Sequence, residues 1–91
     1  MVETRRLLIT GRVQGVYYRA TMVQVAEQHG ASGWVRNLSD GRVEAVIQGD
    51  GETIARMIAW ARRGPDAAIV DEVLVEEADG DFDGFVQIAT L

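Results

Sequence analysis

The chain has 91 residues, of which 47% are hydrophobic and 25% are charged, the composition of one ordinary folded domain spanning residues 1–91. No apolar run is long enough to cross a bilayer, and the first residues lack the apolar stretch of a secretory signal. We therefore expect a cytoplasmic protein with no membrane partner. Cysteine and lysine are absent and the only histidine is His29, which excludes thiol and lysine nucleophiles and multi-histidine metal sites.

The formal charge of −5 is divided unevenly along the chain. Residues 1–42 carry six arginines against three acidic residues, a net charge of +3. Residues 43–91 carry three arginines against eleven acidic residues, a net charge of −8. The overall negative charge argues against a nucleic-acid partner, because nucleic-acid-binding domains normally present a basic surface. The positive first half suits a small anion.

The first half of the chain predicts two strand regions around one helix. Apolar residues recur at every second position over 5–13, which predicts a strand. From 18 to 29 their spacing is helical, and Gly30 is a typical helix end. Residues 32–38 and 42–48 are expected to be strands, and the Ser-Asp-Gly segment between them is typical of a hairpin turn.

The second half predicts one helix and two strands. Asp50 is a typical N-cap residue and predicts a helix over 52–63, which Gly64-Pro65 ends. Strands are expected at 69–77 and 84–89. The order is thus βαββαβ with an extra C-terminal strand. Two right-handed crossovers onto one sheet predict an α+β, ferredoxin-like sandwich, in which an antiparallel sheet carries both helices on one face.

The segment between the first strand and the first helix is the best candidate for binding chemistry. Backbone N–H groups converge where a helix begins, and together with the helix dipole they bind phosphate. Gly15 allows close approach of the backbone, and Arg19 in the first turn can clamp an anion with two donors. On these residues alone, a solvated arginine at an ordinary glycine-containing turn is the simpler explanation.

Three blocks of sequence resemble the acylphosphatase family. Val13-Gln-Gly-Val-Tyr-Tyr-Arg19 is similar to the family signature V-Q-G-V-x-[FY]-R. Gly33-Trp-Val-Arg-Asn37 and Asp40-Gly-Arg-Val-Glu44 follow at the expected distance. Gly64-Pro65, with Ala68, Val70 and Val73, resembles the family pattern G-P-x-x-A-x-V-x-x-V. The resemblance is collinear over essentially the whole chain.

The resemblance implies an enzyme that hydrolyses carboxyl-phosphate mixed anhydrides to a carboxylate and inorganic phosphate, with no metal and no cofactor. Arg19 then binds phosphate and Asn37 positions the attacking water. The phosphate-binding loop comprises Gln14, Gly15, Val16, Tyr17, Tyr18 and Arg19. The expected partners are a small-molecule acyl phosphate and inorganic phosphate as product inhibitor, and we expect a monomer. The alternative function is a non-catalytic module that binds carbamoyl phosphate or another anion.

Other features have plainer explanations. Asn37 also suits an ordinary turn at a strand end, and one of the two adjacent tyrosines is expected to face the core while the other lines the mouth of the site. The Asp79-x-Asp81-x-Asp83 spacing matches the start of a calcium loop, but Thr90 stands where that loop has a glutamate. His29 is expected to pack at a helix end. The chain ends Ile88-Ala-Thr-Leu91, where many family members carry an arginine and an aromatic residue.

Overall fold

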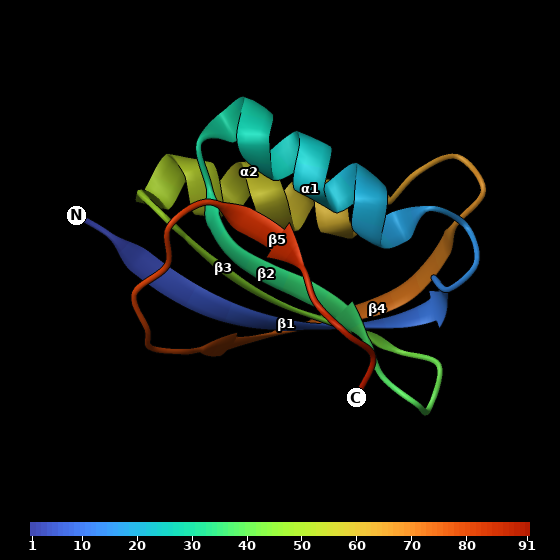
Figure 1. Cartoon of the computed structure of the whole chain (residues 1–91). Helices are drawn as coiled ribbons and strands as arrows, with labels where there is room; N and C mark the ends of the chain where they lie inside the picture. Colours follow the sequence, from blue (N-terminus) through green and yellow to red (C-terminus); the bar gives the residue numbers. More distant parts are fainter.

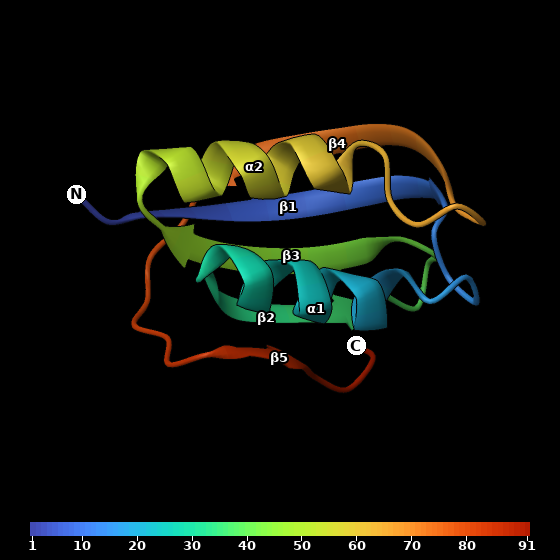
Figure 2. The same ribbon diagram turned by 90° about the horizontal axis from the view of Figure 1, so that it is seen from above.

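Two helices lie on one face of a five-stranded sheet (Figures 1 and 2) in a computed structural model that describes all residues 1–91. The predicted α+β sandwich of the ferredoxin-like kind is confirmed, including the extra strand. The elements, in chain order, are β1 (Glu3–Arg12), α1 (Tyr18–His29), β2 (Ser32–Asn37), β3 (Val43–Gly49), α2 (Gly51–Ala61), β4 (Ile69–Glu77) and β5 (Phe85–Gln87).

The sheet has the strand order β4-β1-β3-β2-β5 and is mixed. The first four strands pair antiparallel as expected, but β5 pairs parallel with β2. The connection explains the difference: the chain leaves β4 at the end of the sheet where β2 begins, and residues 78–84 stay at that end (Figure 1). Strand β5 therefore starts beside the start of β2 and runs in the same direction.

The core lies between the sheet and the helices. Alternate residues of the strands, such as Leu7 and Ile9 on β1 and Ile47 on β3, are fully buried against the helices. Met22 of α1 and Met57 of α2 are the corresponding fully buried helix residues. The apolar residues at every second strand position and those at helical spacing thus pack together in one core.

Gly11 controls the path of the chain into the segment that follows β1. Its φ is +131°, and a β-bulge between Thr10 and Gly11 shifts the pairing of β1 with β4. A Cβ at Gly11 would lie 2.1 Å from the Ile69 carbonyl oxygen. Only glycine allows this close approach, which bends the end of β1 at the point where the chain turns toward α1.

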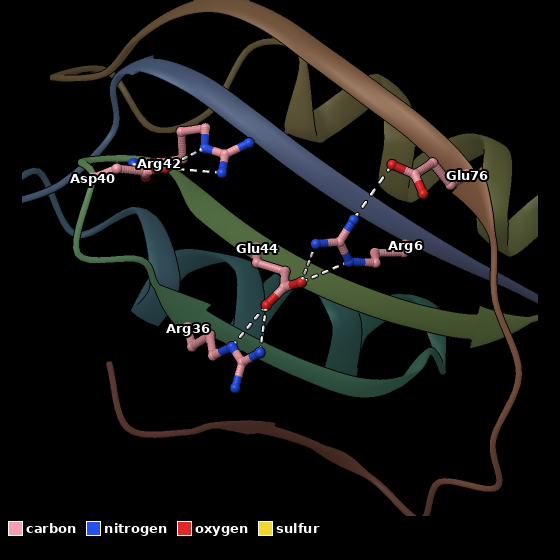
Figure 3. Close-up of polar contacts among 6 residues, drawn as sticks. All are labelled: Arg6, Arg36, Asp40, Arg42, Glu44 and Glu76. Carbon is pink, nitrogen blue, oxygen red and sulfur yellow. Dashed lines mark hydrogen bonds and ion pairs between the residues drawn. The ribbon is translucent and has the colours of Figure 1, made fainter. Parts of the chain in front are cut away.

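The face of the sheet turned away from the helices carries a buried carboxylate. Glu44 is only 5% exposed, and its two oxygens accept hydrogen bonds from Arg6 Nε at 2.6 Å and Arg36 Nε at 2.7 Å. Arg6 also pairs with Glu76 at 3.3 Å, so the contacts run across β2, β3, β1 and β4 (Figure 3). The Arg36 guanidinium lies 4.8 Å from the centre of the Trp34 ring. No helix covers this face, and the arginine side chains shield it instead.

The pKa of Glu44 reflects a balance of two effects. Burial alone would raise it, but the hydrogen bonds and positive charges of Arg36 and Arg6 outweigh burial and lower the pKa below its ordinary value of 4.5. The folded chain therefore holds the ionised carboxylate more firmly than the unfolded chain does. This contribution to stability is complete above the ordinary pKa and is lost as the pH falls through the lower pKa of the folded state.

Replacing Glu44 with glutamine should destabilise the fold in a pH-dependent way. We expect Glu44→Gln to lower the free energy of unfolding by about 2 kcal/mol at neutral pH, because both arginines lose their shielded anionic partner. The difference from the wild type should shrink once the pH falls below the folded-state pKa of Glu44, where the wild-type carboxyl is also neutral. Urea unfolding at neutral and acidic pH measures both values.

Asp40→Asn is a suitable control, since the ion pair between Asp40 and Arg42 lies on the exposed surface. Its removal should have little effect on stability at either pH. An equal loss of stability for Glu44→Gln at neutral and acidic pH would show that the charge of Glu44 is not what stabilises the network.

Candidate active site

Three segments meet at one end of the sheet. Strand β1 ends there, α1 begins there, and β2 ends there, because α1 runs back over the sheet in the direction opposite to β1 and β2 (Figures 1 and 2). Residues 13–17 form the loop from β1 to α1. The fold therefore brings the sequence-predicted phosphate-binding loop and the end of β2, where Asn37 lies, to the same edge of the molecule.

The loop leaves its backbone N–H groups without partners inside the protein. No backbone N–H group from Gln14 to Ala20 donates to another backbone group, and the first to do so is Thr21 N–H, to the Tyr17 carbonyl at 3.0 Å. No side chain caps the start of α1, and its first turn has no acidic residue. Gly15 and Tyr17 have φ of 74° and 64°, and such left-handed residues turn successive N–H groups toward one side of a loop.

Arg19 is the one charged side chain in the first turn of α1, directly after this loop, and it is half-buried. It forms no ion pair, in contrast to Arg5, Arg6, Arg36, Arg42 and Arg56, which are all paired. Together with Gly15 and Tyr17 it lines a cavity of about 420 Å³. Its guanidinium is thus available to an anion that the free N–H groups also reach.

Asn37 lies at the end of β2 with a half-buried side chain. Its Oδ1 atom is buried and accepts no hydrogen bond from the protein. The backbone around it is held on both sides, by β3 and by Leu91, whose N–H donates to the Asn37 carbonyl at 3.1 Å. Asn37 lies at the same end of the sheet as Arg19, but it does not line the cavity, and its unpaired Oδ1 has almost no surface open to solvent.

The Gln14 side chain links the loop to the hairpin that follows Asn37. Its Nε2 donates to the Leu38 carbonyl at 2.8 Å and to the Arg42 carbonyl at 2.9 Å. The side chain is therefore occupied inside the protein, and only the backbone N–H of Gln14 is free for an anion. Nothing in the sequence indicated this link, because its acceptors are backbone carbonyls that any residue supplies.

The two adjacent tyrosines have different roles, as the sequence predicted. Tyr18 is buried, its hydroxyl donates to the Ala61 carbonyl at 2.7 Å, and its ring centre lies 5.1 Å from that of Trp60. Burial raises the pKa of the Tyr18 hydroxyl well above its ordinary value. Gly64 makes room for this ring, since a Cβ there would lie 2.8 Å from Tyr18 Cε2. Tyr17, in contrast, is 81% exposed.

The remaining candidate residues lie elsewhere. His29 is half-buried at the far end of α1 from the loop, and its carbonyl accepts a hydrogen bond from Thr53 at 3.4 Å. No three acidic or histidine side chains, those of Asp79, Asp81 and Asp83 included, come together as a group that could hold a metal ion. Neither helix is long and apolar enough to cross a membrane.

In an α+β sandwich, free N–H groups and an unpaired arginine at a helix start form a candidate site for an oxyanion such as phosphate. Comparison with known proteins identifies the family to which this domain belongs. The family model "Acylphosphatase" matches residues 5–87, and the chain belongs to the acylphosphatase family. It is an enzyme of that family, a hydrolase of acyl phosphates.

Relatives and solved structures agree with the family model. An acylphosphatase of Albidiferax ferrireducens is 54% identical over 82 residues, which cover 90% of this chain and 89% of the relative. One of Thiobacillus denitrificans is 49% identical over 92% of this chain and 94% of the relative. The solved structure of an acylphosphatase from Coxiella burnetii is 34% identical, with a TM-score of 0.92 over 96% of this chain and 93% of that one. None of these favours the alternative of a non-catalytic module.

Proposed function

We propose that the chain hydrolyses acyl phosphates without a metal ion, with Arg19 and the N–H groups of residues 14–19 holding the phosphoryl group and Asn37 orienting the attacking water. The observation that carries this proposal is the combination of free backbone donors and an unpaired Arg19 at the start of α1. The half-buried side chain of Asn37, at the end of β2 and at the same end of the sheet, supports the second role. A monomeric state and a cytoplasmic location are part of the same proposal.

The reaction suits the residues available. The leaving group of an acyl phosphate is a carboxylate of low basicity, so its departure does not require a strong general acid. The chain has no lysine and no cysteine, and His29 lies at the far end of α1. Rate enhancement then has to come from positioning and from stabilisation of the charge that develops on the phosphoryl oxygens.

Arg19 and the loop supply that stabilisation. The N–H groups are fixed by the backbone before substrate arrives, so they need little reorganisation as charge develops. The guanidinium of Arg19 offers two parallel donors, which match two phosphoryl oxygens. Since the side chain is half-buried, its interaction with the substrate is less weakened by solvent than that of an exposed arginine.

Asn37 supplies the geometry for attack. Its half-buried side-chain amide forms a hydrogen bond with the water, which directs a lone pair of the water oxygen toward phosphorus. The new bond between the water oxygen and phosphorus forms as the bond from phosphorus to the acyl oxygen breaks, and the carboxylate leaves with the electron pair. A phosphoryl oxygen takes the proton of the water, and the products are the carboxylate and inorganic phosphate.

The proposal is tested by hydrolysis of benzoyl phosphate in the presence of a chelator. We expect full activity with EDTA and competitive inhibition by inorganic phosphate, because phosphate occupies the same N–H groups and Arg19. Steady-state kinetics over a range of phosphate concentrations measures both. Activity that disappears with chelator and returns with a divalent cation would contradict the metal-free mechanism.

Arg19 and Asn37 should affect different kinetic quantities. Arg19→Ala should lower kcat/KM by about 10²–10³ or more and weaken phosphate binding, since it removes the clamp on the developing charge. Arg19→Lys should recover little of the lost kcat/KM, because the point charge of lysine lacks the planar pair of donors of arginine. Asn37→Ala should lower kcat by roughly 10² while the inhibition constant of phosphate changes only a few-fold.

These expectations are checked by kinetics together with calorimetric titration of inorganic phosphate and a thermal melt. Both variants should remain folded, since neither side chain is fully buried. If Asn37→Ala loses phosphate affinity as severely as Arg19→Ala, Asn37 is a phosphate ligand and the water-positioning role is wrong.

Gln14 should act as a positioning residue. Gln14→Leu removes the two hydrogen bonds that hold the loop against the 38–42 hairpin, and we expect kcat to fall roughly 10-fold while phosphate affinity stays within a few-fold. The loss of hydrogen bonds should also lower the melting temperature modestly. Kinetics, phosphate titration and thermal melts of the variant give the three values.

Gln48→Leu is the matched control. Gln48 also donates two hydrogen bonds through its Nε2, to Thr4 Oγ1 at 2.9 Å and to the Gly80 carbonyl at 2.6 Å, but at the opposite end of the sheet, where it pairs with Thr4 at the start of β1. It should lower the melting temperature to a similar extent and leave kcat unchanged. Equal effects of the two variants on kcat would show that Gln14 contributes only to the stability of the fold and does not position the loop for catalysis.

A further inference from the structure

Tyr17 adopts a backbone conformation that its side chain disfavours. Its φ of 64° and ψ of 22° place it in the left-handed region, and it is the only residue other than glycine with a positive φ. Glycine adopts this conformation without penalty and asparagine tolerates it, whereas bulky side chains rarely do. The requirements of the fold alone would therefore favour glycine or asparagine at this position.

The Tyr17 side chain makes no contribution to the fold that explains its presence. It is 81% exposed, and its hydroxyl forms no hydrogen bond within the protein. The neighbouring Tyr18 supplies the aromatic ring that packs in the core. The backbone of Tyr17, in contrast, is held firmly, because its carbonyl accepts hydrogen bonds from Thr21 N–H at 3.0 Å and from Thr21 Oγ1 at 2.7 Å. A large ring is thus held exposed at a fixed point of the loop.

That fixed point lies at the cavity that Arg19 lines. The cavity volume of about 420 Å³ lies within the range of roughly 300–1,000 Å³ that is usual for sites of small organic ligands. A phosphoryl group held by Arg19 and Gly15 uses only the part of this space beside them. The rest is bounded by the other lining residues, among them Tyr17, Ala20 and Gln87 on β5.

We infer that Tyr17 is a specificity-determining residue whose ring contacts the acyl group and favours aromatic or similarly large apolar acyl phosphates. This inference rests on the proposed function for the phosphoryl side of the site. An aromatic acyl group covers the exposed ring, so that both lose contact with water and the two rings stack. An acetyl group offers too little apolar surface to gain from the same contact.

The test compares two variants on two substrates. Tyr17→Asn tolerates the left-handed backbone and lacks the ring, whereas Tyr17→Phe keeps the ring and lacks the hydroxyl. For Tyr17→Asn we expect kcat/KM to fall about 5- to 10-fold more with benzoyl phosphate than with acetyl phosphate. For Tyr17→Phe the ratio of kcat/KM for benzoyl phosphate to that for acetyl phosphate should stay within about two-fold of the wild-type ratio. Each variant is compared with the wild type on the same substrate, so the intrinsic reactivities of the substrates cancel.

A melting temperature of Tyr17→Asn that equals or exceeds that of the wild type is also expected, because the strained residue is gone. An equal loss with both substrates would mean that Tyr17 shapes the phosphate-binding loop, and an unchanged benzoyl phosphate rate would mean that the ring touches no acyl group. Either result overturns the inference.

Binding of phosphonates separates this inference from the proposed function. Wild-type protein that hydrolyses neither substrate would contradict the proposed function alone, and calorimetry with benzylphosphonate and methylphosphonate still tests Tyr17. We expect Tyr17→Asn to weaken benzylphosphonate binding about five-fold more than methylphosphonate binding. Equal changes for the two phosphonates would overturn the inference.

Discussion

The burial of Tyr18 is the contact on which the site depends. Its ring lies in the core against Trp60, and its hydroxyl is bonded to the Ala61 carbonyl at the end of α2. This anchors the first turn of α1 in place, so the N–H groups beside it keep their positions although they have no partners in the protein. Gly64 belongs to a block of sequence far from the loop, yet its lack of a side chain is what admits the ring. Tyr18 and Gly64, which lie in two separate blocks of the family pattern, are therefore needed for the same packing contact.

The arginines on the outer face of the sheet and the arginine at its end differ in their partners. On the outer face, Arg6 and Arg36 converge on Glu44, and each guanidinium is neutralised by a carboxylate. At the end of the sheet, Arg19 has no acidic neighbour within ion-pair distance. Arg6 and Arg36 stabilise the sheet where no helix covers it, whereas Arg19 keeps its charge available to a ligand. Arg12, Arg62 and Arg63 also form no ion pair, so the lack of a partner alone does not single out Arg19; its place at the start of α1 does.

Local signals allowed most of the elements to be predicted. The strand at 69–77 and the helix at 18–29 match the structure, because alternation, helical spacing and a terminal glycine are properties of neighbouring residues. Asp50 caps α2 as expected and accepts a hydrogen bond from Thr53 N–H at 2.8 Å. The helix predicted over 52–63 ends earlier, at Ala61, and the last strand is shorter than expected. Ends of elements depend on tertiary contacts that spacing does not reveal.

The features that the sequence did not reveal are all tertiary. The parallel pairing of β5 depends on where a connection crosses the sheet, and the link from Gln14 ends on carbonyl groups. Burial of Glu44 requires two arginines from other strands. In the candidate site, the positions of Arg19 and Asn37 came from the family resemblance, because a glycine and an arginine at a turn are too common to indicate phosphate binding. Which tyrosine faces the core follows from the packing against α2.

The position of β4 at the edge of the sheet has a consequence for self-association. Its outer edge has no neighbouring strand, and Ile69, Leu74 and Val75 are exposed on it, which is the composition of a strand that recruits other strands. The same strand carries four carboxylates, at positions 71, 72, 76 and 77. Two copies that approached edge to edge would bring these negative charges together. The acidic second half of the chain thus protects an open edge by repulsion, a protection that high salt and low pH weaken.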